Sequence, residues 1–133
     1  MKRTKSLVAV SLAVAALAAA WGLQAQQPGF TRTLLQKLDS SAQGREIVQA
    51  KAEFVPGGAA GKHTHPGEEI GYILQGTLQL EVEGKPPVAL NAGDFFSVPA
   101  GTVHDGKNIA SGNTIVLATY VVEKGQPLAT PVK

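Results

Sequence analysis

The sequence predicts an all-β domain built as a sandwich or barrel, and three observations support this. Short segments rich in β-branched and aromatic residues recur along the chain, turn-forming residues separate them, and no helical period lies between them. Clusters of Gly, Pro and Asn provide the turns. The predicted strands cover residues 45–55, 70–74, 77–82, 95–98 and 114–122.

The first 25 residues have the order of features typical of a secretory signal. Lys2, Arg3 and Lys5 precede an apolar stretch over residues 6–20, and a stop with a small residue follows near Leu23-Gln24-Ala25. That stretch is shorter than the roughly 20 apolar residues that span a bilayer. We therefore expect cleavage after Ala25, a periplasmic or secreted protein, and no stable membrane anchor after cleavage. The chain has no cysteine, which excludes disulfides and a lipid-anchored cysteine.

Behind the signal, the sequence indicates one small domain. We expect an N-terminal tail and first element over residues 26–44, the β-barrel over 45–123 and an irregular C-terminal tail over 124–133. Within the first part, residues 31–39 fit a helix or a strand equally well.

Charge argues against a nucleic-acid partner. The whole chain has 12 basic and 10 acidic residues, but removing Lys2, Arg3 and Lys5 with the signal leaves 9 basic residues against 10 acidic. No Lys/Arg cluster remains to contact a phosphate backbone.

Two of the three histidines lie one residue apart in "GGAAGKHTHPGEE", residues 57–69. On a strand, His63 and His65 would project from the same face. Glu69 follows a Pro-Gly turn that can bring its carboxylate back toward them. Two imidazoles and a carboxylate suit a divalent first-row metal, whereas the alternative is an ordinary exposed loop rich in histidine.

The third histidine lies in a second patterned stretch, "GDFFSVPAGTVHDGKN", residues 93–108. This stretch resembles the second motif of the cupin superfamily, and residues 57–76 resemble the first. Ten motif positions are filled at the expected spacing: Gly57, His63, His65, Glu69, Gly76, Gly93, Pro99, Gly101, His104 and Asn108. The chain is thus similar to small single-domain bacterial cupins of the quercetinase-like type.

The resemblance implies a cupin jelly-roll, or double-stranded β-helix, barrel. It implies that His63, His65, Glu69 and His104 bind a divalent transition metal, which would be Mn, Fe, Ni, Co, Cu or Zn. Glu69 would also be the candidate catalytic base. The glycines and Pro99 are expected to form turns.

Other residues near the motifs are expected to have ordinary roles. On strand alternation, Glu68, Asp105 and Lys107 face away from the ligands and belong to the surface or the rim. Asn108 either orients the ligands or forms a turn. Arg32 and Arg45 lie outside both motifs, so nothing in the sequence suggests an arginine clamp for an anionic substrate. Four apolar residues are candidates for a pocket or for core: Ile73, Phe96, Val98 and Tyr120.

Two functions follow from this pattern. The first is a metal-dependent oxygenase, isomerase or lyase acting on a small organic molecule. The second is a non-enzymatic module that binds or senses a small ligand, with the metal in a structural or ligand-holding role. Exposed edges of small jelly-roll sheets also favour a homodimer.

Overall fold

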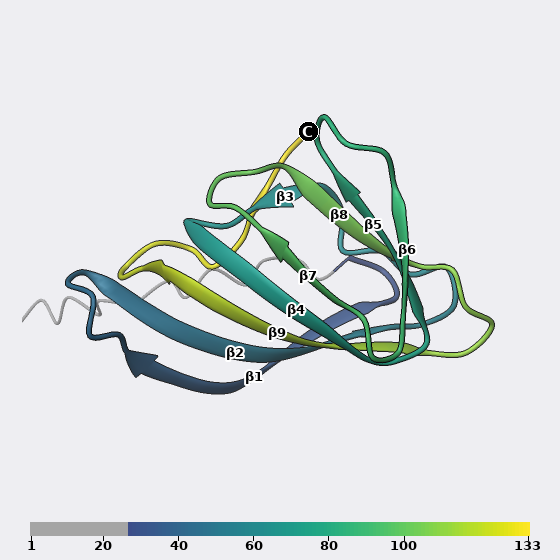
Figure 1. The fold of residues 1–133 in the computed structure, drawn as a ribbon, viewed down its shortest axis with the longest axis horizontal. Helices are drawn as coiled ribbons and strands as arrows, with labels where there is room; N and C mark the ends of the chain where they lie inside the picture. The colour runs from purple at the N-terminus through teal and green to yellow at the C-terminus, as the bar shows by residue number, and fades with distance from the viewer. Residues whose placement is uncertain (1–26) are drawn as a thin grey trace, which may run out of the picture.

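A computed structural model describes residues 27–133, and this part of the chain is all-β, as predicted. The strands form two five-stranded antiparallel sheets that face each other (Figure 1). The strands are β1 (Phe30–Asp39), β2 (Arg45–Phe54), β3 (His63–Thr64), β4 (Gly67–Gln75), β5 (Thr77–Val82), β6 (Val88–Asn91), β7 (Phe95–Val98), β8 (His104–Asn108), β9 (Thr114–Glu123) and β10 (Thr130–Pro131).

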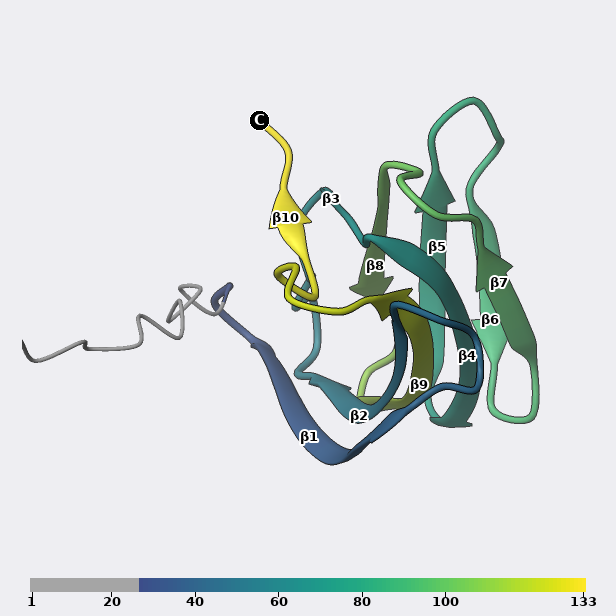
Figure 2. The same cartoon turned by 90° about the vertical axis from the view of Figure 1, so that its left-hand side faces the viewer.

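The strand order explains how distant motifs meet. One sheet has the order β1-β2-β9-β4-β7 and the other β10-β3-β8-β5-β6. Strands β3 and β8, which carry the two histidine motifs, are neighbours, and His63 lies directly opposite His104. Figure 2 shows β10 beside β3 at one end of the barrel.

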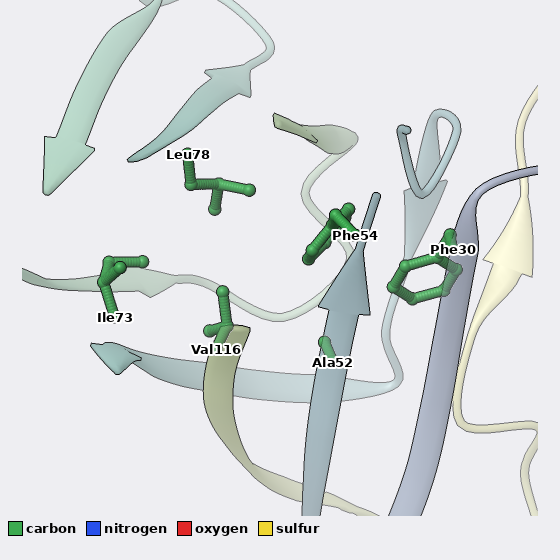
Figure 3. Close-up of a cluster of buried hydrophobic side chains, with 6 residues drawn as sticks. All are labelled: Phe30, Ala52, Phe54, Ile73, Leu78 and Val116. Atoms are coloured by element: carbon green, nitrogen blue, oxygen red, sulfur yellow. The ribbon is translucent and has the colours of Figure 1, made fainter. Parts of the chain in front are cut away.

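The barrel interior follows the strict alternation of the long strands. Along β2 and β9, every second side chain is buried and the others are half-buried or exposed. One buried cluster contains aromatic and branched side chains from both sheets (Figure 3). Its members are Phe30, Ala52, Phe54, Ile73, Leu78 and Val116. These apolar walls lie beside the candidate site described below.

The structure resolves the ambiguity over residues 31–39, which belong to strand β1. Phe30 is a buried core residue that begins this strand, whereas the sequence assigned it to a tail. The C-terminal segment is largely irregular but contributes β10. The predicted signal lies outside the described residues, and export stays a prediction.

Two glycines of the motifs adopt backbone conformations that other residues rarely reach. Gly76 has φ of 80° between β4 and β5, and Gly101 has φ of 68° between β7 and β8. A Cβ atom on Gly76 would also lie 2.4 Å from the Thr114 hydroxyl oxygen. The predicted turn-forming role of these glycines is confirmed.

Asn108 is a structural residue, because its side chain joins three segments. Its Nδ2 donates to the carbonyl oxygens of Phe54 (3.0 Å) and Gly112 (2.8 Å). Its Oδ1 accepts from the Ala110 amide and the Thr114 hydroxyl, both at 2.8 Å. All four hydrogen-bonding positions of the amide are therefore satisfied at a buried site.

We expect Asn108→Ala to lower the free energy of unfolding by about 2–4 kcal/mol, because it leaves buried partners without hydrogen bonds. Chemical denaturation of the metal-free protein would measure this. The neighbouring exposed Asn113 provides the control, and Asn113→Ala should change stability by less than about 0.5 kcal/mol. Equal losses in the two variants would contradict the structural role of Asn108.

Two expectations concern a membrane anchor and a second copy of the chain. Among residues 27–133, no membrane-spanning helix is found. The five-stranded sheet that contains β9 has β1 and β7 as its edges, and β1 exposes Leu34, Leu35 and Leu38. A homodimer stays a prediction.

Candidate metal site

The four predicted ligands come together inside the barrel. His63 lies on β3, His65 directly after it, Glu69 on β4 and His104 on β8, so the cluster joins the two sheets. One ligand atom from each side chain can be chosen so that all four atoms lie within 4.8 Å of one another. All four residues are at least 93% buried, and the imidazole centroids are 4.3–5.1 Å apart.

A backbone carbonyl fixes the orientation of each imidazole. The Nδ1 atoms of His63, His65 and His104 lie 2.6, 2.5 and 2.9 Å from the carbonyl oxygens of Gly61, Leu128 and Thr102, respectively. A carbonyl can only accept, so each Nδ1 carries the proton and each neutral ring keeps its Nε2 lone pair. Metal-binding histidines are commonly oriented in this way.

The contacts of Glu69 show that these residues fit a cation. Its Oε2 lies 2.9 Å from His104 Nε2 and 3.1 Å from His65 Nε2. The buried His65 Nε2 makes no hydrogen bond, so its close approach to the carboxylate is electrostatic only. Lone pairs of two neutral imidazoles facing a carboxylate repel it unless a proton or a metal ion lies between them. Three nitrogen donors and one carboxylate suit a divalent transition metal.

The same contacts shift the pKa values of the ligands. Burial alone would raise the pKa of Glu69, but the histidine contacts outweigh burial and hold it well below its ordinary range. Burial lowers the pKa of His63 to about 4. Burial would also lower the pKa of His104, but its hydrogen bonds to Glu69 and the Thr102 carbonyl raise it above its ordinary value.

These shifts predict that metal affinity depends on pH. Because the pKa of His104 is raised in the metal-free protein, a proton occupies its Nε2 at low pH and must leave before metal binds. Affinity should rise with pH up to the pKa of His104, and fall about tenfold per pH unit below it. Competition titrations against a chelator between about pH 5.5 and 8 would measure this. An affinity independent of pH would contradict proton competition at His104.

A small cavity lies next to the cluster. Its volume is about 30 Å³, it is partly open to solvent, and His63, Glu69 and His104 form part of its wall. Most of the remaining wall is apolar. Of the four apolar candidates from the sequence, Phe96 and Tyr120 line the cavity, whereas Ile73 and Val98 are buried outside its lining.

Arg32 also lines this cavity, and sequence reasoning did not find it. It lies on β1, far from both motifs, and no motif spacing identifies it. The available signal was strand alternation, which places Arg32 on the same face as the buried Phe30. Its guanidinium carbon lies 5.2 Å from the Phe30 ring centroid and 5.8 Å from that of Tyr120.

The polar residues next to the candidate ligands in sequence differ in how exposed they are. Glu68 and Lys107 are exposed, as expected, and Asp105 is half-buried. Burial raises the pKa of Asp105. Asn108 makes its hydrogen bonds to the barrel frame, so its structural role is the one observed.

This fold and site define a class of protein: double-stranded β-helix proteins with a three-histidine, one-carboxylate cluster that can hold a metal ion. The family comparison agrees, because the model of the cupin domain family matches residues 50–125. The chain belongs to the cupin domain family.

The chain is also similar in sequence or in fold to individual known proteins. A probable germin-like protein, subfamily 2 member 5, from Arabidopsis thaliana is 36% identical over 79 residues, which are 56% of this chain and 37% of that protein. This chain therefore spans well under half the length of that curated relative. Among solved structures, an oxalate oxidase bound to the substrate analogue glycolate has a TM-score of 0.64 at 23% identity, covering 78% of this chain and 55% of the other.

The dimethylsulfoniopropionate lyase DddQ from Ruegeria pomeroyi has a TM-score of 0.63 at 22% identity, covering 77% of this chain and 51% of that protein. At these identities, the two structural likenesses show the shared fold.

Proposed function

We propose that this protein is a metal-dependent enzyme that acts on a small organic molecule, by oxygenase, isomerase or lyase chemistry. The observation that supports this most is the position of the four-ligand cluster on the wall of a cavity that is otherwise mainly apolar. A molecule bound in the cavity could therefore reach the metal-binding side chains, while the apolar walls limit the access of water to them.

His63, His65, Glu69 and His104 would hold the metal, one of Mn, Fe, Ni, Co, Cu or Zn. A bound divalent ion supplies Lewis acidity toward an oxygen atom of the substrate. The low pKa of Glu69 keeps its carboxylate ionised at neutral pH, the form that binds a cation. Glu69 is also the candidate catalytic base, although so low a pKa makes its carboxylate a weak one.

The similar proteins support an enzyme without selecting one reaction. An oxalate oxidase and a dimethylsulfoniopropionate lyase carry out different chemistry on a related barrel. Fold alone does not determine function.

A second candidate function is ligand binding without turnover. Apart from the cluster and Arg32, the ionisable group in the cavity wall is the Tyr120 hydroxyl. Burial raises its pKa, so it stays protonated at neutral pH and cannot act as a base there. The site therefore has no separate acid–base pair beside the ligands.

The test begins with the metal content of the protein purified from its native compartment. The metal-loaded protein is then screened for turnover and oxygen uptake with phenols, diketones and sugar acids. His104→Ala is the matched variant, and it should lose metal and turnover together. Bound metal without any turnover across the panels would favour the binding module, and unchanged metal content in His104→Ala would contradict the site.

A further inference from the structure

Arg32 has no role in holding the metal, yet its side chain lines the cavity beside the ligands. Its guanidinium lies near the rings of Phe30 and Tyr120. Its Nε is buried and has no hydrogen-bond partner. A buried guanidinium N–H without an acceptor is costly, so a ligand atom that accepts a hydrogen bond there would be stabilised.

The charges around the cavity also favour an anion. Glu69 is the acidic side chain of the cavity wall, and Arg32 balances its charge. When a divalent metal joins three neutral histidines and Glu69, the charges facing the cavity sum to about +2, counting Arg32. Mainly apolar walls screen this charge poorly, so an anionic ligand gains more here than in water.

The size of the cavity selects the kind of anion. Its volume of about 30 Å³ has room for about two water-sized groups. A planar carboxylate fits such a space, and its two oxygens match the fork of a guanidinium. The neighbouring side chains of Phe30, Phe54 and Val116 suit the apolar carbon atoms next to a carboxylate.

We propose that Arg32 anchors the carboxylate of an organic acid bound beside the metal cluster. The proposal rests on the proposed metal site and narrows its substrate class to small organic acids. The remainder of the ligand extends toward the open side of the cavity.

The test uses protein loaded with Zn²⁺, which is diamagnetic, and compares propionate with its neutral isostere propionamide. NMR titration should show propionate binding at least about tenfold more tightly, because only the carboxylate pairs with the guanidinium. The ¹⁵N resonance of Arg32 Nε should shift on addition of propionate and not of propionamide. Arg32→Met should reduce the preference at least about fivefold, to what the charge of the metal supplies, and Arg32→Lys should retain part of it.

Lys107→Met is the matched control, because it removes one positive charge from an exposed position. This variant should keep the full preference for propionate. A preference of unchanged size in Arg32→Met would show that the metal alone holds the anion and would overturn the proposal. Tighter binding of inorganic phosphate than of propionate would overturn it in favour of a phosphoryl ligand.

Zinc content, measured for every variant, separates this proposal from the proposed function. Parent protein that retains no zinc would contradict the metal site and, with it, the anchoring role of Arg32. If the parent protein retains zinc but shows no preference for propionate, only the proposed role of Arg32 is contradicted, and the metal site stands. Denaturation midpoints of the Arg32 variants identify any loss that comes from unfolding.

Discussion

Glu69→Gln is expected to weaken binding of a divalent transition metal by about 100-fold or more, while Glu68→Gln leaves it within about twofold. The two carboxylates are adjacent in sequence but face opposite sides of β4. Glu69 is 7% exposed and its Oε2 lies between two imidazoles, whereas Glu68 is exposed. An amide is a weaker ligand than a carboxylate and removes the negative charge that offsets the cation.

Chelator competition on the two purified variants would measure this difference. Far-UV circular dichroism shows whether each variant keeps the β fold. Equal affinities in Glu69→Gln and the parent would show that the carboxylate does not bind the metal. Equal losses in the two variants would indicate an effect of net charge alone.

Ile73→Ala is expected to lower the free energy of unfolding by about 2–5 kcal/mol, because it opens a cavity in a packed interior. The Ile73 side chain is fully buried within the cluster of Figure 3. The Tm of a domain of this size should fall by about 10 °C or more. Ile70 lies on the same strand with 54% of its surface exposed, so Ile70→Ala is the matched control.

The measurement is chemical and thermal denaturation of the metal-free protein, because bound metal would add stability of its own. Ile70→Ala should change the free energy of unfolding by less than about 1 kcal/mol. A similar loss in both variants would contradict the assignment of the buried face of β4.

The sequence predicted five of the strands, because these segments are rich in β-branched and aromatic residues. The predicted residues 77–82 and 95–98 coincide with β5 and β7. It did not predict β8, whose residues His104–Asn108 include Asp, Gly and Lys and resemble a turn. That segment becomes a strand because it pairs with β5 along its length and with β3 at His104, so tertiary pairing overrides its weak local preference.

The candidate ligands could be predicted because His63, His65, Glu69 and His104 occupy positions of two motifs that resemble those of the cupins. Arg32 could not, because a side chain that only faces a cavity needs no fixed distance in sequence from the ligands. The contact between His65 Nδ1 and the Leu128 carbonyl could not be predicted either, because every residue has a backbone carbonyl and its side chain does not indicate which one is used. The sequence therefore predicted the candidate metal ligands, but it did not predict Arg32 or the backbone carbonyl that surround them.

The Leu128 carbonyl has a consequence for the order of events during biosynthesis. The four ligand side chains are all made by residue 104, but β9, which holds β4 against β2, and the carbonyl that orients His65 are made later. A nascent chain from which His104 has just emerged thus carries every candidate ligand without the frame that aligns them. We expect stable metal loading to follow the emergence of residues 114–128, so the metal is acquired by a folded chain and does not nucleate its folding.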